Sequence, residues 1–122
     1  MEFVARARAG LNMERSKLVA FGWTRRVNGD AAQDATLANL LAAETEVVCI
    51  VGKASAYHVT EALRTSLDEG VAMVADSIRY LKSRGRTVFF DAEHFFDGYR
   101  ADPDFSLRVL QGAAEAGADC LV

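Results

Sequence analysis

Four short apolar runs alternate with longer amphipathic stretches along the chain. The runs are rich in Val, Ile, Phe or Leu and span Leu18–Phe21, Glu46–Val51, Thr87–Phe90 and Asp119–Val122. Such runs, without polar alternation, are typical of parallel strands that are buried on both faces. Each gap between them is long enough for the crossover that parallel strands need. The pattern predicts an α/β fold with the order α-β-α-β-α-β-α-β, either an open doubly wound sheet or part of a closed barrel.

Apolar residues at helical spacing predict a helix before each run. The apolar faces of the first three predicted helices are marked by Phe3, Val4, Ala7 and Leu11; by Leu37, Leu40 and Leu41; and by Val71, Val74, Ile78 and Leu81. Thr65 and Asp68 resemble a capping box at the start of the third helix, and Gly85 is a natural stop for it. Asp102–Pro103 supplies a cap and a first-turn proline for the fourth helix, which Gly117 ends.

Composition and charge exclude several classes of protein. The 122 residues suffice for one domain, and 51% are hydrophobic, which excludes a disordered chain. The net charge of -3, without a concentrated positive patch, argues against nucleic-acid or membrane-surface binding. No apolar stretch of roughly 20 residues is present, and we expect no signal peptide, because Met1 leads directly into charged, amphipathic sequence. Cys49 and Cys120 lie in apolar runs, which indicates buried thiols and a cytoplasmic protein. Because Val122 lies within an apolar run, we expect a chain truncated at this end and also at Met1.

Polar residues gather in the three loops that follow the first three runs, at positions 22–26, 52–58 and 91–99. Parallel α/β folds bind ligands at the carboxyl ends of their strands. Asp91, Glu93 and His94 form the strongest local feature, because carboxylate and imidazole can act on a substrate or bind a metal. In an extended segment Asp91 and Glu93 point the same way and His94 points the other way. A solvated loop with a helix cap is an equally good interpretation of these residues.

The other polar residues of these loops each have two interpretations. Lys53 could hold an anionic substrate, although a surface lysine is the more common case. His58 could take part in a site or only begin a helix. Arg25–Arg26 could bind carboxylate or phosphate, or form salt bridges at the rim. Gly22 and Gly52 are expected to permit tight turns at the strand ends.

Four segments, in order and with matching gaps, resemble the citramalate synthases. Lys17–Arg26 is similar to a KLVAFGSTRR segment of that family, and Val51–Leu63 to a segment of the form FGKSWDLHVTEAL. Asp91–Tyr99 matches the motif DAEHFFDGY without a change, and Gly117–Val122 resembles the strand leading into a CDTNGG motif. The family lies in a wider group with 2-isopropylmalate, homocitrate and hydroxymethylglutaryl-CoA enzymes.

The resemblance implies a partial TIM (β/α)8 barrel, with strands three to six in one pyruvate carboxyltransferase-like (HMGL-like) domain over residues 1–122. It implies an acyltransferase of isoleucine or leucine biosynthesis that joins acetyl-CoA and pyruvate, a 2-oxo acid, to give citramalate and CoA. A divalent metal (Mg, Mn or Zn) would polarise the oxo-acid carbonyl, with its ligands outside this chain. The parent enzyme would be a homodimer, and this chain alone would be inactive, because four strands do not close a barrel.

The resemblance also suggests individual site residues. Glu93 falls on the family's active-site glutamate and is the expected catalytic residue. Asp91 and His94 are its neighbours at the same strand end.

Thr24, Lys53 and His58 fall on positions that line the barrel mouth and are expected to bind substrate. Trp23 departs from the family, which usually has Ser there. Alternatives to a citramalate synthase fragment are a 2-isopropylmalate or homocitrate synthase fragment, a non-catalytic half-barrel that assembles with another chain, and a small α/β ligand-binding domain.

Overall fold

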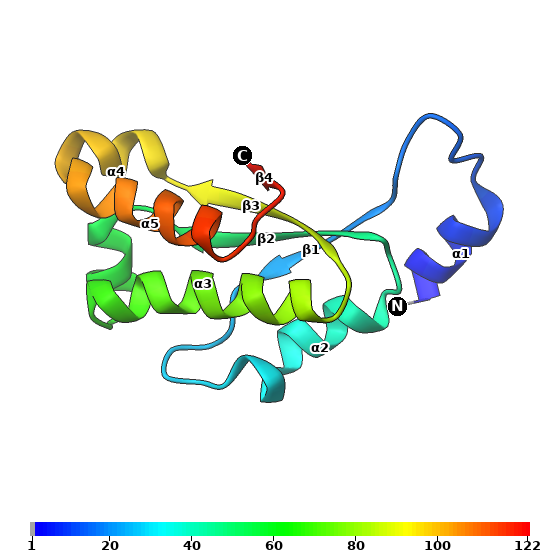
Figure 1. Ribbon diagram of the computed structural model, residues 1–122, viewed down its shortest axis with the longest axis horizontal. Helices are drawn as coiled ribbons and strands as arrows, with labels where there is room; N and C mark the ends of the chain where they lie inside the picture. Colours follow the sequence, from blue (N-terminus) through cyan, green and yellow to red (C-terminus); the bar gives the residue numbers. More distant parts are fainter. Residues whose placement is uncertain (1) are drawn as a thin grey trace.

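Four parallel strands form one sheet in the order in which they occur in the chain (Figure 1). The computed structural model describes residues 2–122. The strands are β1 (Val19–Trp23), β2 (Val47–Lys53), β3 (Thr87–Glu93) and β4 (Cys120–Leu121). The predicted α/β fold is confirmed, and a sequentially ordered parallel sheet is consistent with one section of a TIM-barrel wall. β1, β2 and β3 each run two or three residues beyond the predicted ends, because their last residues still pair across the sheet.

Helical segments connect the strands. They are α1 (Glu2–Gly10), η1 (Ala31–Gln33), α2 (Ala35–Ala42), η2 (His58–Ala62), α3 (Leu67–Ser83), α4 (Phe95–Ala101) and α5 (Pro103–Glu115). The four predicted helices are all present. η2, a single π-helical turn, begins at His58, in agreement with the interpretation of that residue as a helix start, whereas α4 lies mostly in a stretch expected to be a loop. Within residues 2–122, none of the helices is long and apolar enough to cross a membrane.

Only one face of the sheet is covered by helices, and the other face is open. On the covered side, Val48, Ile50, Val88 and Phe90 are fully buried against side chains of α2, α3 and α5. On the open side, Phe21 and Trp23 of β1 are exposed, and Phe89 of β3 is partly so. The prediction of strands buried on both faces is therefore wrong for β1, whereas in β2 Val47 and Val51 are buried on the open side as well. Cys120 lies at the edge of the sheet and is exposed, so its predicted burial is also wrong, and Cys49 is only partly buried.

The helix ends follow the predicted signals, with one shift of a residue. Ser66, not Thr65, caps α3 by accepting a hydrogen bond from the Glu69 N–H at 3.1 Å. The Ser-x-x-Glu spacing is that of a capping box. Gly85 and Gly117 follow α3 and α5 with left-handed backbones, as predicted for helix stops. α1, in contrast, has no buried side chain, and Phe3 on its apolar face is 78% exposed.

Gly22 and Gly52 lie inside strands and make room for side chains. A Cβ on Gly22 would lie 3.1 Å from Leu40, and one on Gly52 would lie 2.9 Å from both Phe90 and Val74. The expectation that these glycines form turns is therefore wrong. Their small size lets α2 and α3 pack closely against the carboxyl ends of β1 and β2.

Gly98 holds α4 against the loop that follows β2, and its replacement by alanine is expected to destabilise the chain. A Cβ there would lie 2.6 Å from the Ala54 carbonyl oxygen and 2.8 Å from the Ser55 Cα, both of which belong to backbone. We expect Gly98→Ala to lower the free energy of unfolding by about 1–3 kcal/mol, measured by urea denaturation. Gly10→Ala is the control, because nothing lies within 4 Å of its added methyl group. Equal stability of the two variants would contradict the tight contact.

Candidate functional site

Lys53 and Glu93 form an ion pair at the carboxyl ends of the two central strands. They are the last residues of β2 and β3 and are direct partners in the sheet register. The Lys53 Nζ donates to Glu93 Oε2, and the two side chains are only 19% and 30% exposed. The Ala54 N–H donates to the Glu93 carbonyl at 2.9 Å, which fixes the backbone beneath the pair. Partial burial strengthens such a pair relative to one in bulk water.

Trp23 and Thr24 lie beside this pair at the end of β1. The Lys53 Nζ is 5.6 Å from the centroid of the Trp23 ring, a cation–π distance. The Thr24 N–H donates to the Val51 carbonyl at 3.3 Å, which extends the pairing of β1 and β2 by one bond. Trp23, Lys53 and Glu93 therefore form a row across three neighbouring strands on the open face.

Both histidines of the chain lie next to Glu93. His94 has a left-handed backbone (φ 61°) at the start of α4, so the chain leaves the extended conformation directly after Glu93. His94 Nε2 lies 3.8 Å from Glu93 Oε1, and its ring stacks on that of His58, with centroids 4.0 Å apart and planes 5° from parallel. The prediction that His94 points away from Glu93 is therefore wrong. The sequence did not reveal this turn, because a left-handed histidine has no strong local signal.

Asp91 lies two residues before Glu93 on the same face of β3, as the strand pattern predicts, and is partly buried. Its carboxylate adds a negative charge to the open face of the sheet. Burial raises the pKa of the Cys49 thiol, and the negative charge of Asp91 raises it further. Asp91 is thus close enough to Cys49 for its charge to act on the thiol, at a level of the sheet below the Lys53–Glu93 pair.

Two hollows flank the ion pair. The first, of about 450 Å³, is lined by Asp91, Glu93, His94, Phe96, Leu121 and Val122, among others. The second, of about 410 Å³, is lined by Trp23, Thr24, Arg26, Lys53, Leu63 and Met73, among others. Both volumes fall in the range of small-molecule sites. Glu93 borders one hollow and Lys53 the other, so the pair lies between two spaces that could each hold part of a substrate.

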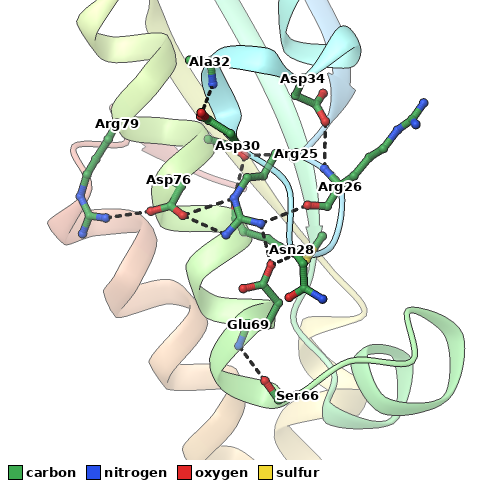
Figure 2. Close-up of polar contacts among 12 residues, drawn as sticks. Arg25, Arg26, Asn28, Asp30, Ala32, Asp34, Ser66, Glu69, Asp76 and Arg79 are labelled. Atoms are coloured by element: carbon green, nitrogen blue, oxygen red, sulfur yellow. Dashed lines mark hydrogen bonds and ion pairs between the residues drawn. The ribbon is translucent and has the colours of Figure 1, made fainter.

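A buried arginine fixes the loop that follows Trp23 and Thr24 (Figure 2). Arg25 is 4% exposed, and its guanidinium donates to Glu69 at 2.6 Å and to Asp76 at 2.9 Å, both on α3. The Arg25 N–H donates to Ser77 Oγ at 2.8 Å. The guanidinium of Arg25 is therefore bonded to α3 and is not available to a ligand. Of the two interpretations of this residue, the one that assigned it to salt bridges is confirmed.

The contacts between Arg25 and the acidic residues of α3 shift the pKa values of Arg25 and Glu69. The hydrogen bond from Arg25 lowers the pKa of Glu69, and the Asn28 N–H, which donates to it at 2.7 Å, acts in the same direction. Burial alone would lower the pKa of Arg25, but its bonds to Glu69 and Asp76 outweigh burial and raise it. Glu69 and Asp76 lie seven residues apart on one face of a helix, a spacing that could have identified them as a pair.

Arg26 differs from Arg25. Its N–H donates to Asp34 Oδ2 at 3.0 Å, but its side chain is exposed and extends away from the network (Figure 2). Arg26 is one of the residues that line the second hollow, where its guanidinium could bind an anionic group.

The described residues do not form a metal site of their own. In the part of the chain from residue 2 to residue 122, no three His, Cys, Asp or Glu side chains are placed to hold an ion. Glu93 and His94 bring a carboxylate and an imidazole together, but these residues offer no third ligand of this kind beside them.

Curated relatives resemble the chain over most of its length, whereas no family model matches it. An (R)-citramalate synthase of Streptomyces coelicolor is 50% identical over 121 residues, which cover 99% of this chain and 23% of that protein. An (R)-citramalate synthase of Aquifex aeolicus is 46% identical over 112 residues, 92% of this chain and 21% of that protein. A homocitrate synthase of Methanopyrus kandleri is 33% identical over 113 residues, 93% of this chain and 25% of that protein.

These relationships identify the segment, not a whole enzyme. The chain spans about a fifth of the length of the (R)-citramalate synthases that it matches. Homocitrate and 2-isopropylmalate synthases match with lower identity. Over nearly its whole length, the chain is homologous to one segment of the (R)-citramalate synthases, and the homocitrate and 2-isopropylmalate synthases are its more distant relatives.

Proposed function

We propose that the chain forms strands three to six of a TIM-barrel domain that condenses acetyl-CoA with pyruvate, giving citramalate and CoA. The placement of Lys53 and Glu93 carries the proposal. The two residues are paired at adjacent strand ends, on the face that helices leave open, between two hollows of substrate size. In a barrel this face would be the interior, and the strand ends would be its catalytic mouth.

In this proposal Glu93 is the catalytic residue. A proton leaves the methyl group of acetyl-CoA, the carbanion attacks the keto carbon of pyruvate, and water cleaves the thioester to release CoA. Glu93 would act on a proton in this sequence as a general acid or base. Its second oxygen, 3.8 Å from His94 Nε2, faces an imidazole that can also carry a proton.

Lys53 would orient Glu93 and bind the acid. An ammonium has three N–H donors, of which Glu93 takes one, so two remain for the carboxylate of a 2-oxo acid. Thr24 borders the same hollow of about 410 Å³ as Lys53, and its hydroxyl group would contribute to binding of the acid. Asp91 and His58 would shape the mouth, His58 by stacking on His94.

The divalent ion that the resemblance implies would polarise the keto group. Because the described residues do not supply a set of ligands, we assign no step through the ion to this chain. The proposal also includes a homodimeric, cytoplasmic enzyme of isoleucine biosynthesis. A reducing compartment agrees with the free thiols of Cys49 and Cys120.

A chimera tests the proposal directly. Residues 1–122 would replace the corresponding segment of the Streptomyces coelicolor (R)-citramalate synthase, to which they are 50% identical. We expect CoA release that requires both acetyl-CoA and pyruvate, measured with a thiol reagent. The unmodified relative is the positive control, and 2-oxoisovalerate and 2-oxoglutarate test the distant alternatives. A chimera that folds, by circular dichroism and size, but releases no CoA would contradict the proposal.

A further inference from the structure

The two histidines of the chain lie at the same end of the sheet, one directly before α4 and the other in η2, between β2 and α3 (Figure 1). Each lies at an unusual piece of backbone. His94 is left-handed (φ 61°), which is uncommon for a residue other than glycine. His58 begins the single π-helical turn of the chain between residues 2 and 122. Left-handed non-glycine residues and single π-helical turns both cluster at functional sites. These two backbone features together place the rings of His58 and His94 in contact.

The stacked pair places one imidazole beside the Glu93 carboxylate. The two rings are nearly parallel, with planes 5° apart and centroids separated by 4.0 Å. His94 Nε2 lies 3.8 Å from Glu93 Oε1, whereas His58 has no carboxylate at ion-pair distance among residues 2–122. The other oxygen of the same carboxylate, Oε2, accepts a hydrogen bond from the Lys53 Nζ. The carboxylate of the proposed catalytic residue is therefore contacted on both of its oxygens.

The backbone that carries the two rings is held by tight contacts. The Ser106 hydroxyl group donates to the Ala54 carbonyl at 2.7 Å. Gly98 packs so closely on that carbonyl that an added Cβ would lie 2.6 Å from its oxygen, and the Gly98 N–H donates to the His94 carbonyl at 2.9 Å. The Ala54 N–H donates to the Glu93 carbonyl, also at 2.9 Å. The loop that leads to η2 is thus joined to the segment that carries Glu93 and His94, which limits how far the rings can separate through backbone movement.

We propose that His94 is a positioning residue that orients the Glu93 carboxylate, and that His58 is a positioning residue that acts through His94. The inference rests on the proposed function, in which Glu93 acts as a general acid or base. With Lys53 bonded to one oxygen and an imidazole beside the other, rotation of the carboxylate breaks one of the two contacts. Stacking on His58 favours the orientation in which the His94 ring faces Glu93.

The test measures kcat and the KM for pyruvate in the chimera described above. His94→Asn removes the imidazole but keeps a residue that tolerates the left-handed backbone. We expect it to lower kcat by about 10–100-fold, because misplacement of a catalytic group by about 1 Å can cost about 10²-fold in rate, and to change KM by less than about threefold. His58→Leu should lower kcat by about 5–10-fold, the effect of a lost ring contact. His58→Phe, which can still stack, should stay within about twofold of the parent.

Tyr57→Leu is the matched control for His58→Leu. The Tyr57 ring meets His58 edge-on at 5.7 Å between centroids and is 69% exposed, so its loss should leave kcat within about twofold of the parent. In the His94→Asn background, His58→Leu should have no further effect, because the role of His58 passes through His94. Additive losses from the two histidine variants, or an equal loss in Tyr57→Leu, would overturn the role of His58.

The outcomes separate this inference from the proposed function. If the unaltered chimera releases no CoA, the proposed function fails and the inference fails with it. If the chimera is active and His94→Asn keeps more than half of the parental kcat, the positioning role is overturned and the function stands. Should His94→Asn fail to fold, as judged by circular dichroism, the His58 variants decide alone, because the loss in His58→Leu must still be restored in His58→Phe.

Discussion

Glu93→Gln in the active chimera is expected to lower kcat for CoA release by about 10²–10⁴-fold, with a smaller change in KM. Glutamine keeps the shape of the side chain but cannot act as a general acid or base at neutral pH. It also leaves Lys53 without its counter-charge. The proposed chemistry would therefore lose its acid–base group while the strand ends keep their geometry. Steady-state rates at saturating acetyl-CoA, with pyruvate varied, measure both parameters.

Glu61→Gln is the control for this prediction. Glu61 carries the same chemical change on the neighbouring η2 segment, but it is exposed and lies outside the Lys53–Glu93 row. We expect its kcat to stay within about twofold of the parent chimera. A Glu93→Gln variant that keeps more than a tenth of the parent kcat would remove Glu93 from the catalytic role.

A double-mutant cycle separates orientation from catalysis. If Lys53 acts mainly by holding Glu93, Lys53→Gln should cost much less in the Glu93→Gln background than in the parent. If Lys53 also binds the 2-oxo acid, Lys53→Gln should raise the KM for pyruvate in both backgrounds. Additive losses in kcat would mean that the two residues act independently, despite their ion pair.

The architecture could be predicted because its signals are local. Apolar runs at Glu46–Val51 and Thr87–Phe90 mark strands, Gly85 and Gly117 need left-handed backbones, and Asp102 caps α5 with its own side chain. The predicted end of β3 is short because Asp91 and Glu93 are charged, and those of β1 and β2 are short because Gly22 and Gly52 are expected to form turns. Hydrophobic pattern stops at the first charge, whereas the hydrogen bonds of β3 continue to Glu93.

The site could be predicted only in part, because its contacts join distant segments. Strand alternation puts Asp91 and Glu93 on one face, and topology puts the ends of β2 and β3 together. Nothing local shows that Lys53 pairs with Glu93, or that His94 turns back toward His58. Arg25 shows the same limit: its partners lie 44 and 51 residues away on α3, and only the packed fold brings them together.

Arg25→Met should destabilise the chain by about 2–4 kcal/mol at neutral pH, measured by urea denaturation. Breaking a buried ion pair costs about 3–5 kcal/mol, and the partial exposure of Glu69 (18%) and Asp76 (45%) reduces that figure. The matched control is Arg79→Met, which removes a 3.4 Å contact with the same Asp76 from a side chain that is 60% exposed. We expect the control to cost less than about 1 kcal/mol. Equal losses would mean that the burial of Arg25 has no special effect.

The loss caused by Arg25→Met should shrink in acid, because the ion pair needs an ionised Glu69. The bond from Arg25 holds the folded-state pKa of Glu69 below its ordinary value of 4.5. A carboxylate with a lowered folded-state pKa stabilises the fold above its unfolded pKa, and this contribution disappears as the pH falls through the folded value. The free energies of unfolding of parent and variant should therefore converge below about pH 4.5. Asp119 has a lowered pKa through Lys82 and the Val88 N–H, so both proteins should still lose stability in acid. A difference between them that stays constant from neutral to acid pH would show that Arg25 acts through packing alone.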